Sequence, residues 1–177
     1  MRLFTALEIP ADILATLERV VDQLRPTAPI HWSRTASLHV TTKFIGSWPE
    51  DRLEDLKAAL ARIPPSPPIQ AQIRGLGFRR GLFLCGVVAP QLAALAGATE
   101  QATSPLGIVP ETRTYVPHLT MARIKKPCDL RPLRAAAAAI DSSDFGSFEA
   151  HSFFLYQSHL QPGGSVYTKL AEFPLSH

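Results

Sequence analysis

The sequence predicts an α+β fold in which helices pack against largely antiparallel sheets. Strand-like and helix-like segments are interspersed along the chain, and some strand-like segments follow one another across short turns, as in β-hairpins. The chain has 177 residues, of which 46% are hydrophobic and 19% charged, and this suits one substantial core. We therefore expect a single domain over residues 1–177, built from two lobes.

The first strand and the first helix are expected at the N-terminus. Residues 2–9 are compact and apolar and are bounded by Pro10, which predicts a strand. Residues 10–25 carry apolar side chains at helical spacing, which predicts an amphipathic helix.

A second strand and helix follow. Residues 37–46 form the next predicted strand, and Ser47 with Glu50 three residues later matches a capping box. Prolines between residues 64 and 68 end the helix in a stiff connector. The apolar stripe of this helix would consist of Leu53, Leu56, Leu60 and Ile63.

The rest of the chain predicts a hairpin, two helices and three more strands. Residues 69–78 and 82–88 are expected to pair around Arg79-Arg80-Gly81. The remaining predicted elements are helices over 91–103 and 130–140 and strands over 116–124, 148–160 and 166–173, the last two joined by the turn Pro162-Gly163-Gly164.

One short motif occurs once in each half of the chain. His39 and Thr41 flank Val40 just as His118 and Thr120 flank Leu119, and each copy falls in a predicted strand. Side chains two apart on a strand share a face, so each half offers one imidazole beside one hydroxyl. If an approximate twofold axis relates the lobes, with helices on the outer face of each sheet, the two pairs would face each other across a cleft.

Such a pair of motifs suits phosphate chemistry. Two histidines can act as general acid and general base, and two threonine hydroxyls can donate hydrogen bonds to phosphate oxygens. A single His-x-Thr would more often be a half-buried histidine with a satisfied hydrogen bond. The second copy in a matching context favours function.

These residues make the sequence resemble the 2H phosphoesterases, a family named for two His-x-Thr/Ser-x motifs. The likeness is greatest to the bacterial and archaeal RNA 2',3'-cyclic phosphodiesterases, also called 2'-5' RNA ligases. It spans nearly the whole chain, through SLHVTTKFIG, GLGFRR, VPHLTMARIK and LYQSHLQPGGSVYTKLAEFPL. The fourth motif position, usually leucine, is Thr42 in the first copy and Met121 in the second.

The resemblance implies metal-free hydrolysis of a 2',3'-cyclic phosphate at an RNA end, or on a nucleotide, to a 2'-phosphate, with no cofactor. His39 would donate a proton to the departing 3' oxygen, and His118 would accept the proton of the attacking water. Thr41 and Thr120 would hold the non-bridging oxygens. Attack by a 5' hydroxyl would give a 2'-5' linkage without ATP. The alternatives are another cyclic nucleotide or a 2'-5' oligonucleotide as substrate, or a binding module without turnover.

Three further residues are candidates for substrate binding. The resemblance suggests that Phe44 stacks on a base and that Arg123 pairs with phosphate. Strict alternation places both on the wrong face, so either a bulge or a strand end turns them back, or Phe44 is a core residue and Arg123 a solvated charge. Lys43 has the same parity as His39 and Thr41 and would add positive potential to the cleft.

A basic hairpin is the last candidate. Arg74, Arg79 and Arg80 bracket residues 75–78 and could follow an RNA backbone, although a hairpin loop kept soluble by its charges explains them as well.

Composition limits the remaining possibilities. The net charge of +3 allows an anionic partner without requiring one. Cys85 and Cys128 are too few for a disulfide framework or a four-cysteine zinc site, and no apolar run predicts an export signal or a membrane span. We expect a cytoplasmic monomer without metal or obligate protein partner.

Overall fold

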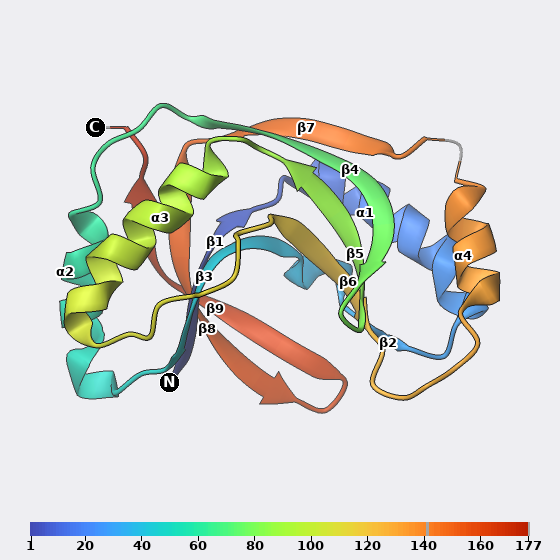
Figure 1. The fold of residues 1–177 in the computed structure, drawn as a ribbon, viewed down its shortest axis with the longest axis horizontal. Coiled ribbons are helices and arrows are strands. Elements are labelled where there is room, and N and C mark those ends of the chain that lie inside the picture. Colours follow the sequence, from blue (N-terminus) through green and yellow to red (C-terminus); the bar gives the residue numbers. More distant parts are fainter. Residues whose placement is uncertain (141, 177) are drawn as a thin grey trace.

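The computed structural model describes residues 1–140 and 142–176, and its strands form two antiparallel sheets (Figure 1). The α+β class predicted from the sequence is therefore confirmed. The four-stranded sheet has the order β3-β1-β8-β9 and consists of β1 (Arg2–Glu8), β3 (His39–Ser47), β8 (Ser152–Gln161) and β9 (Gly164–Pro174). The five-stranded sheet has the order β2-β6-β5-β4-β7 and consists of β2 (His31–Trp32), β4 (Ile69–Arg79), β5 (Leu82–Val88), β6 (His118–Arg123) and β7 (Asp144–Ala150).

Both sheets combine strands from the two halves of the chain. The N-terminal β1 is central in its sheet, between β3 and the C-terminal β8, and residues 3–7 are all buried rather than alternately buried and exposed. In the five-stranded sheet, β6 lies between β2 and β5 from the first half. The two sheets therefore do not correspond to the two halves of the sequence, although each carries one of the two motifs.

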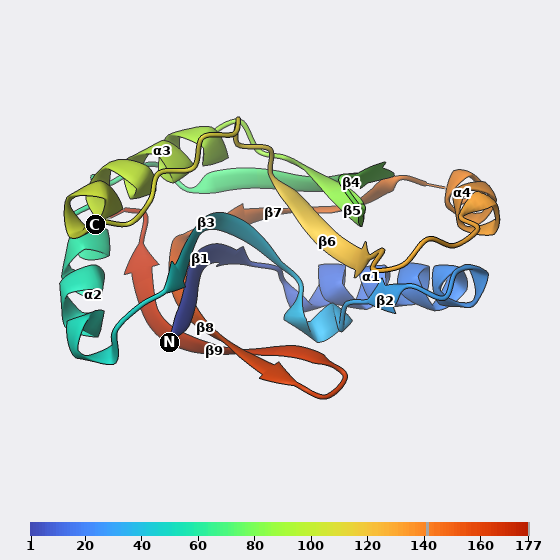
Figure 2. The same ribbon diagram turned by 60° about the horizontal axis from the view of Figure 1, so that its bottom comes forward.

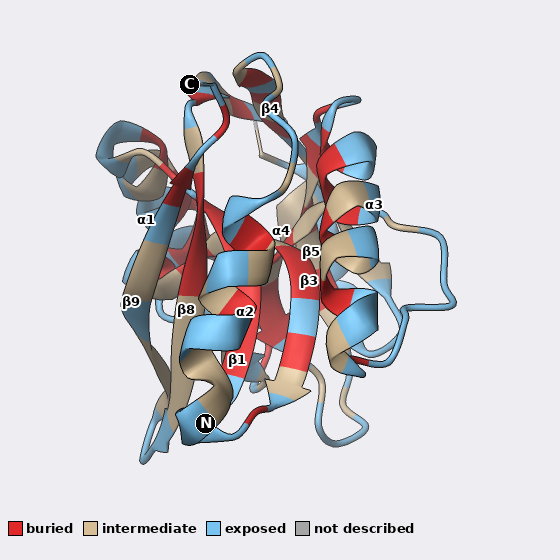
Figure 3. Ribbon diagram, turned by 90° about the vertical axis from the view of Figure 1, so that its left-hand side faces the viewer, coloured by how far each residue is buried: buried red, intermediate tan, exposed pale blue. Residues whose placement is uncertain are grey.

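Helices lie at both ends of the molecule. The helices are α1 (Ala11–Leu24), α2 (Leu53–Ala61), α3 (Leu92–Thr103) and α4 (Arg131–Ala138). Helices α2 and α3 pack together at one end, where α3 contacts β3, and α1 and α4 pack together at the other, where α1 contacts β7 (Figure 2). Seen from the end of α2 and α3, buried residues concentrate on β1, β3 and β8, and the outer surfaces of both helices are exposed (Figure 3).

The buried apolar side chains form one continuous cluster that joins both sheets and the helices. Its largest fully buried members include Phe83 on β5, Phe153 on β8 and Leu17 on α1. No helix among the described residues is long and apolar enough to cross a membrane.

The sequence predictions were wrong at two element boundaries. The single strand predicted over residues 148–160 is two strands, β7 and β8, which separate at His151 and enter different sheets. The predicted capping box does not form: Ser47 is the last residue of β3, and α2 begins only at Leu53 without a side-chain cap. A 3-10 turn over Glu50–Arg52 fills the gap, where the indole of Trp48 donates to the carbonyl of Arg52 at 2.9 Å.

Candidate active site

The two motif histidines begin two neighbouring strands of different sheets. His39 is the first residue of β3 and His118 the first of β6, and these strands contact each other. In each motif the histidine and threonine are partly exposed, and the residue between them, Val40 or Leu119, is fully buried. The predicted alternation is confirmed, with each His–Thr pair on the face turned away from the core.

Each imidazole is held by a hydrogen bond to the backbone carbonyl two residues earlier in the chain. The Nδ1 atom of His39 lies 2.9 Å from the carbonyl oxygen of Ser37, and Nδ1 of His118 lies 2.9 Å from that of Val116. A carbonyl can only accept, so Nδ1 carries the hydrogen in both rings. Each ring therefore has its Nε2 available for a substrate.

A β-bulge follows the threonine of the first motif. The pairing of β3 with β1 skips Thr42, so this residue is extra in the ladder. An extra residue inverts the alternation beyond it. Phe44 therefore lies on the same face as His39 and Thr41, where its side chain is 67% exposed, and Lys43 falls on the opposite face.

The second motif has the same bulge. The pairing of β6 with β5 skips Met121. The β5 partners of His118, Thr120 and Arg123 are alternate residues of that strand, so these three side chains share one face. The sequence left open whether a bulge or a strand end turns Phe44 and Arg123 back, and the structure shows bulges, which bring both residues to the faces of the histidines.

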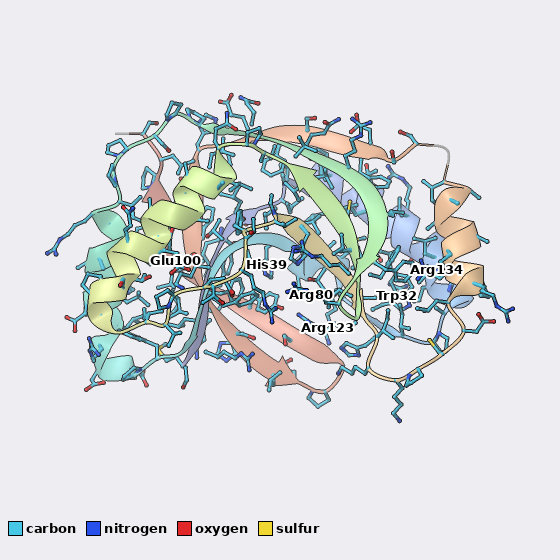
Figure 4. All side chains as sticks on the ribbon, in the orientation of Figure 1. Trp32, His39, Arg80, Glu100, Arg123 and Arg134 are labelled. Carbon is cyan, nitrogen blue, oxygen red and sulfur yellow. The ribbon has the colours of Figure 1, made fainter. Side chains whose placement is uncertain are left out.

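The prediction that Lys43 adds positive potential beside the histidines is wrong. Its side chain is only 2% exposed, and its ammonium donates to Glu100 Oε1 at 2.7 Å and to the carbonyl of Val109 at 3.2 Å. Glu100 lies on α3 (Figure 4), so the ion pair joins β3 to the helix packed against it. The physical reason is the bulge at Thr42, which inverts the alternation of side chains along β3. The prediction assumed an unbroken alternation.

Aromatic rings surround His39. The ring of Phe4 stacks on the imidazole with 4.6 Å between centroids, and Tyr167 meets it edge-on at 4.9 Å. The ring of Tyr156 stacks against Phe4 at 5.3 Å and lies 6.2 Å from the imidazole of His39, both measured between centroids. Sequence analysis did not single out Phe4 or Tyr167, because these rings come from β1 and β9 and only strand pairing brings them to His39.

This environment lowers the pKa of His39 below its usual 6.5. The largest cause is burial, which disfavours the charged imidazolium; the hydrogen bond to Ser37 acts in the opposite direction, and the nearby charge of His118 lowers the pKa further. Burial and His118 thus act together to favour the neutral imidazole at His39.

Hydroxyl groups brace both bulges from outside their strands. Tyr115, in the segment before β6, donates to the carbonyl of Thr41 at 2.9 Å. Ser33, in the segment before β3, donates to the carbonyl of Thr120 at 2.8 Å. Each motif is therefore held by the segment that leads into the other, a relationship that no local sequence signal reveals.

Other features of the surface do not suggest a different centre. Among residues 1–140 and 142–176, no group of three His, Cys, Asp or Glu side chains is arranged to hold a metal ion. Two hollows lie away from the histidines, one between α2 and the end of β9, the other between β4 and α4 where Arg134 covers the ring of Phe78.

Relatives with curated descriptions match this chain over nearly its full length. An RNA 2',3'-cyclic phosphodiesterase of Methanocaldococcus jannaschii is 30% identical over 178 residues, which cover 97% of this chain and 99% of the relative. A protein with the same description from Thermus thermophilus is 30% identical over 190 residues, covering 99% of this chain and 90% of its own.

Solved structures share the fold. A Thermus thermophilus protein superimposes with a TM-score of 0.82 at 28% identity, covering 99% of this chain and 98% of the other. The E. coli LigT structure with 3'-AMP has a TM-score of 0.83 at 21% identity over the same shares of the two chains.

A family model described as LigT like Phosphoesterase matches residues 7–80 and 83–167. The matched ranges contain both bulged motif strands in full. The resemblance seen in the two motifs is thus confirmed, and the chain belongs to the family of LigT-like phosphoesterases.

Proposed function

We propose that the protein opens 2',3'-cyclic phosphates at RNA ends by hydrolysis, leaving a 2'-phosphate. The observation that carries the proposal is the pair of identically oriented histidines, each with Nε2 available and a threonine two residues away on the same face. The descriptions of the relatives from M. jannaschii and T. thermophilus support this choice of substrate.

His118 is the general base in this proposal. With Nδ1–H donated to the carbonyl of Val116, its Nε2 lone pair can take a proton from the attacking water. The water oxygen forms a new bond to phosphorus as the bond from phosphorus to the 3' oxygen breaks. Proton transfer of this kind contributes about 10²- to 10⁴-fold in rate.

His39 is the general acid and protonates the departing 3' oxygen. For this it must be an imidazolium, which donates from Nδ1 to the carbonyl of Ser37 and from Nε2 to the leaving oxygen. In the free protein burial lowers the pKa of His39 and favours the neutral ring. The negative charge of a bound cyclic phosphate acts in the opposite direction, so the substrate itself promotes protonation of the acid.

The remaining site residues hold the substrate. The hydroxyls of Thr41 and Thr120 donate to the non-bridging phosphate oxygens, where negative charge develops. The exposed ring of Phe44 stacks on a base, and the guanidinium of Arg123 pairs with phosphate. Lys43 has no part in this arrangement because its ammonium is bound to Glu100.

The chemistry requires no metal ion or cofactor, because the two imidazoles perform both proton transfers and the hydroxyls stabilise the developing charge.

The reverse reaction, attack by a 5' hydroxyl to form a 2'-5' linkage, is a further proposed activity. Water at about 55 M favours hydrolysis unless the attacking RNA end is held in place. We also propose a monomer in a reducing cytoplasm, consistent with free thiols at Cys85 and Cys128.

The test is incubation, in the presence of EDTA, with a short RNA that ends in a 2',3'-cyclic phosphate. We expect the wild type to release a 2'-phosphate and both His39→Ala and His118→Ala to lose at least about 10²-fold in kcat. His151→Ala is the matched control, because this exposed histidine pairs with Glu149 on β7, outside the motifs. Opening by either motif variant at the wild-type rate would refute the two-histidine mechanism, and a 3'-phosphate product would refute the assigned bond cleavage.

A further inference from the structure

A row of basic side chains crosses the end of the five-stranded sheet next to the second motif. Arg79 of β4 pairs with Leu82 of β5, Leu82 pairs with Arg123 of β6, and Arg123 pairs with His31 of β2. Directly opposed residues of antiparallel strands point to the same face. Arg79, Arg123 and His31 therefore lie in one line across the sheet, on the face that carries His118.

The adjoining turn adds a third arginine. Arg80 is at the tip between β4 and β5 with φ of 48°, the one non-glycine residue with positive φ among those described. The turn lies beside the end of β6, because the carbonyl of Gly81 accepts a 2.8 Å hydrogen bond from the amide of Ile124; Arg80 and Arg123 are labelled in Figure 4. We call Arg79, Arg80, Arg123 and His31 the basic row.

The guanidinium charges of the basic row are not neutralised by ion pairs within the described residues. All four side chains are exposed, and none of them takes part in an ion pair within the described part of the chain. The sequence around them also lacks carboxylates, since residues 26–49, 56–99 and 112–128 contain no Asp or Glu. The modest net charge of +3 thus includes long stretches of sequence whose only charged residues are Lys and Arg.

The two sheets offer different chemistry beside the histidines. The four-stranded sheet presents the exposed ring of Phe44 on the face of His39 and the rings of Tyr156 and Tyr167 next to the imidazole, whereas the five-stranded sheet presents the basic row on the face of His118. Aromatic rings that stack on bases next to cations that contact phosphates are the combination that binds a single nucleic-acid strand.

We propose that the basic row binds phosphates of the RNA strand on the 5' side of the cyclic phosphate, and so makes the end of an RNA strand, rather than a free cyclic mononucleotide, the preferred substrate. Adjacent strands lie about 4.8 Å apart, so Arg79 and Arg123, two strands apart, are separated by roughly 10 Å across the sheet. One phosphate at the motifs cannot contact the whole row. This inference rests on the proposed function and specifies its substrate.

The test compares kcat/KM for a cytidine 2',3'-cyclic phosphate with kcat/KM for single-stranded oligonucleotides of increasing length that carry the same end. We expect kcat/KM of the wild type to increase with length at low salt. In the double variant Arg79→Gln/Arg80→Gln the ratio of oligonucleotide to mononucleotide kcat/KM should fall about tenfold. Arg62→Gln, an exposed arginine after α2 at the other end of the molecule, should leave this ratio at the wild-type value.

Salt dependence gives a second readout. The slope of log kcat/KM against log salt for the oligonucleotide should become shallower by about one for each phosphate that the double variant no longer binds. If the wild type opens the mononucleotide as efficiently as every oligonucleotide, the basic row does not bind the strand, and the proposed function still stands.

Binding measurements keep the inference testable if neither substrate is opened. Fluorescence anisotropy of a labelled single-stranded RNA with a 2'-phosphate end should show weaker binding to the double variant than to Arg62→Gln. Equal affinity of both variants would overturn the inference. Competition by polyglutamate as strong as that by unlabelled RNA would also overturn it, because the row would then be a general site for acidic polymers.

Discussion

The hydroxyl of Tyr115 donates a 2.9 Å hydrogen bond to the carbonyl oxygen of Thr41, and so the segment that leads into one motif holds the bulge of the other. Burial raises the pKa of Tyr115, which keeps the hydroxyl protonated as a donor. Ser33 has the reciprocal role toward Thr120. Because the bulges direct Phe44 and Arg123, the proposed binding residues, to the histidine faces, these two hydroxyls connect the packing of the sheets to the geometry of the site.

Removal of the Tyr115 hydroxyl should therefore affect both stability and substrate binding. Tyr115→Phe keeps the ring but leaves the carbonyl of Thr41 without this donor, so we expect the free energy of unfolding to fall by about 1 kcal/mol. KM should rise more than kcat falls, because the bulge positions Phe44. Urea denaturation and steady-state kinetics measure the two effects, and Ser33→Ala provides the matched variant on the other motif. Unchanged KM in both variants would show that the bulges do not need these bonds.

The ion pair of Lys43 and Glu100 should matter for stability and not for catalysis. Glu100→Gln removes the charge beside a buried ammonium, so we expect a loss of about 1 to 3 kcal/mol in the free energy of unfolding. Because Lys43 faces away from His39, kcat/KM should stay within about twofold of the wild type at temperatures where the variant is folded.

The exposed pair of Glu54 and Lys57 supplies the control for this prediction. Glu54→Gln should change the free energy of unfolding by less than about 0.5 kcal/mol, because a pair in water contributes little. Thermal denaturation of both variants checks the difference. A large drop in kcat/KM for folded Glu100→Gln would contradict the placement of Lys43 outside the site.

The sequence predicted what depends on local periodicity and missed what depends on pairing between distant strands. The shared face of His39 and Thr41 follows from alternation within one strand, and the structure confirms it. The direction of Lys43 depends on the pairing of β3 with β1, in which Thr42 has no partner. No residue pattern within β3 alone predicts where this happens. The break at His151 was hidden because apolar residues continue on both sides of it, in β7 and β8.

Phe44 should contribute to substrate binding without contributing to stability. Its side chain is 67% exposed and lies 6.5 Å from the ring of Phe4, between ring centroids. Phe44→Ala should raise KM for an RNA end by about tenfold, because stacking on a base is worth about 1 to 3 kcal/mol. The free energy of unfolding should change by less than about 0.5 kcal/mol. Leu160→Ala, an apolar truncation in β8 at the still higher exposure of 82%, should change neither quantity. A stability loss without a change in KM would make Phe44 a packing residue.

The lowered pKa of His39 makes protein stability depend on pH in a defined direction. The unfolded chain binds a proton at this ring near the usual pKa of 6.5, whereas the folded protein binds it only at lower pH. As pH falls below about 6.5, the unfolded state gains protons first, so the free energy of unfolding decreases until the folded-state pKa is reached. Above pH 6.5 this contribution is constant.

His39→Gln should remove this part of the pH dependence, so the stability of the wild type relative to the variant should decrease from pH 8 to pH 5. Urea denaturation across that range measures it, with His151→Gln as a control that keeps His39. A difference between wild type and His39→Gln that stays constant with pH would show that the aromatic surroundings of His39 do not disfavour its charged form.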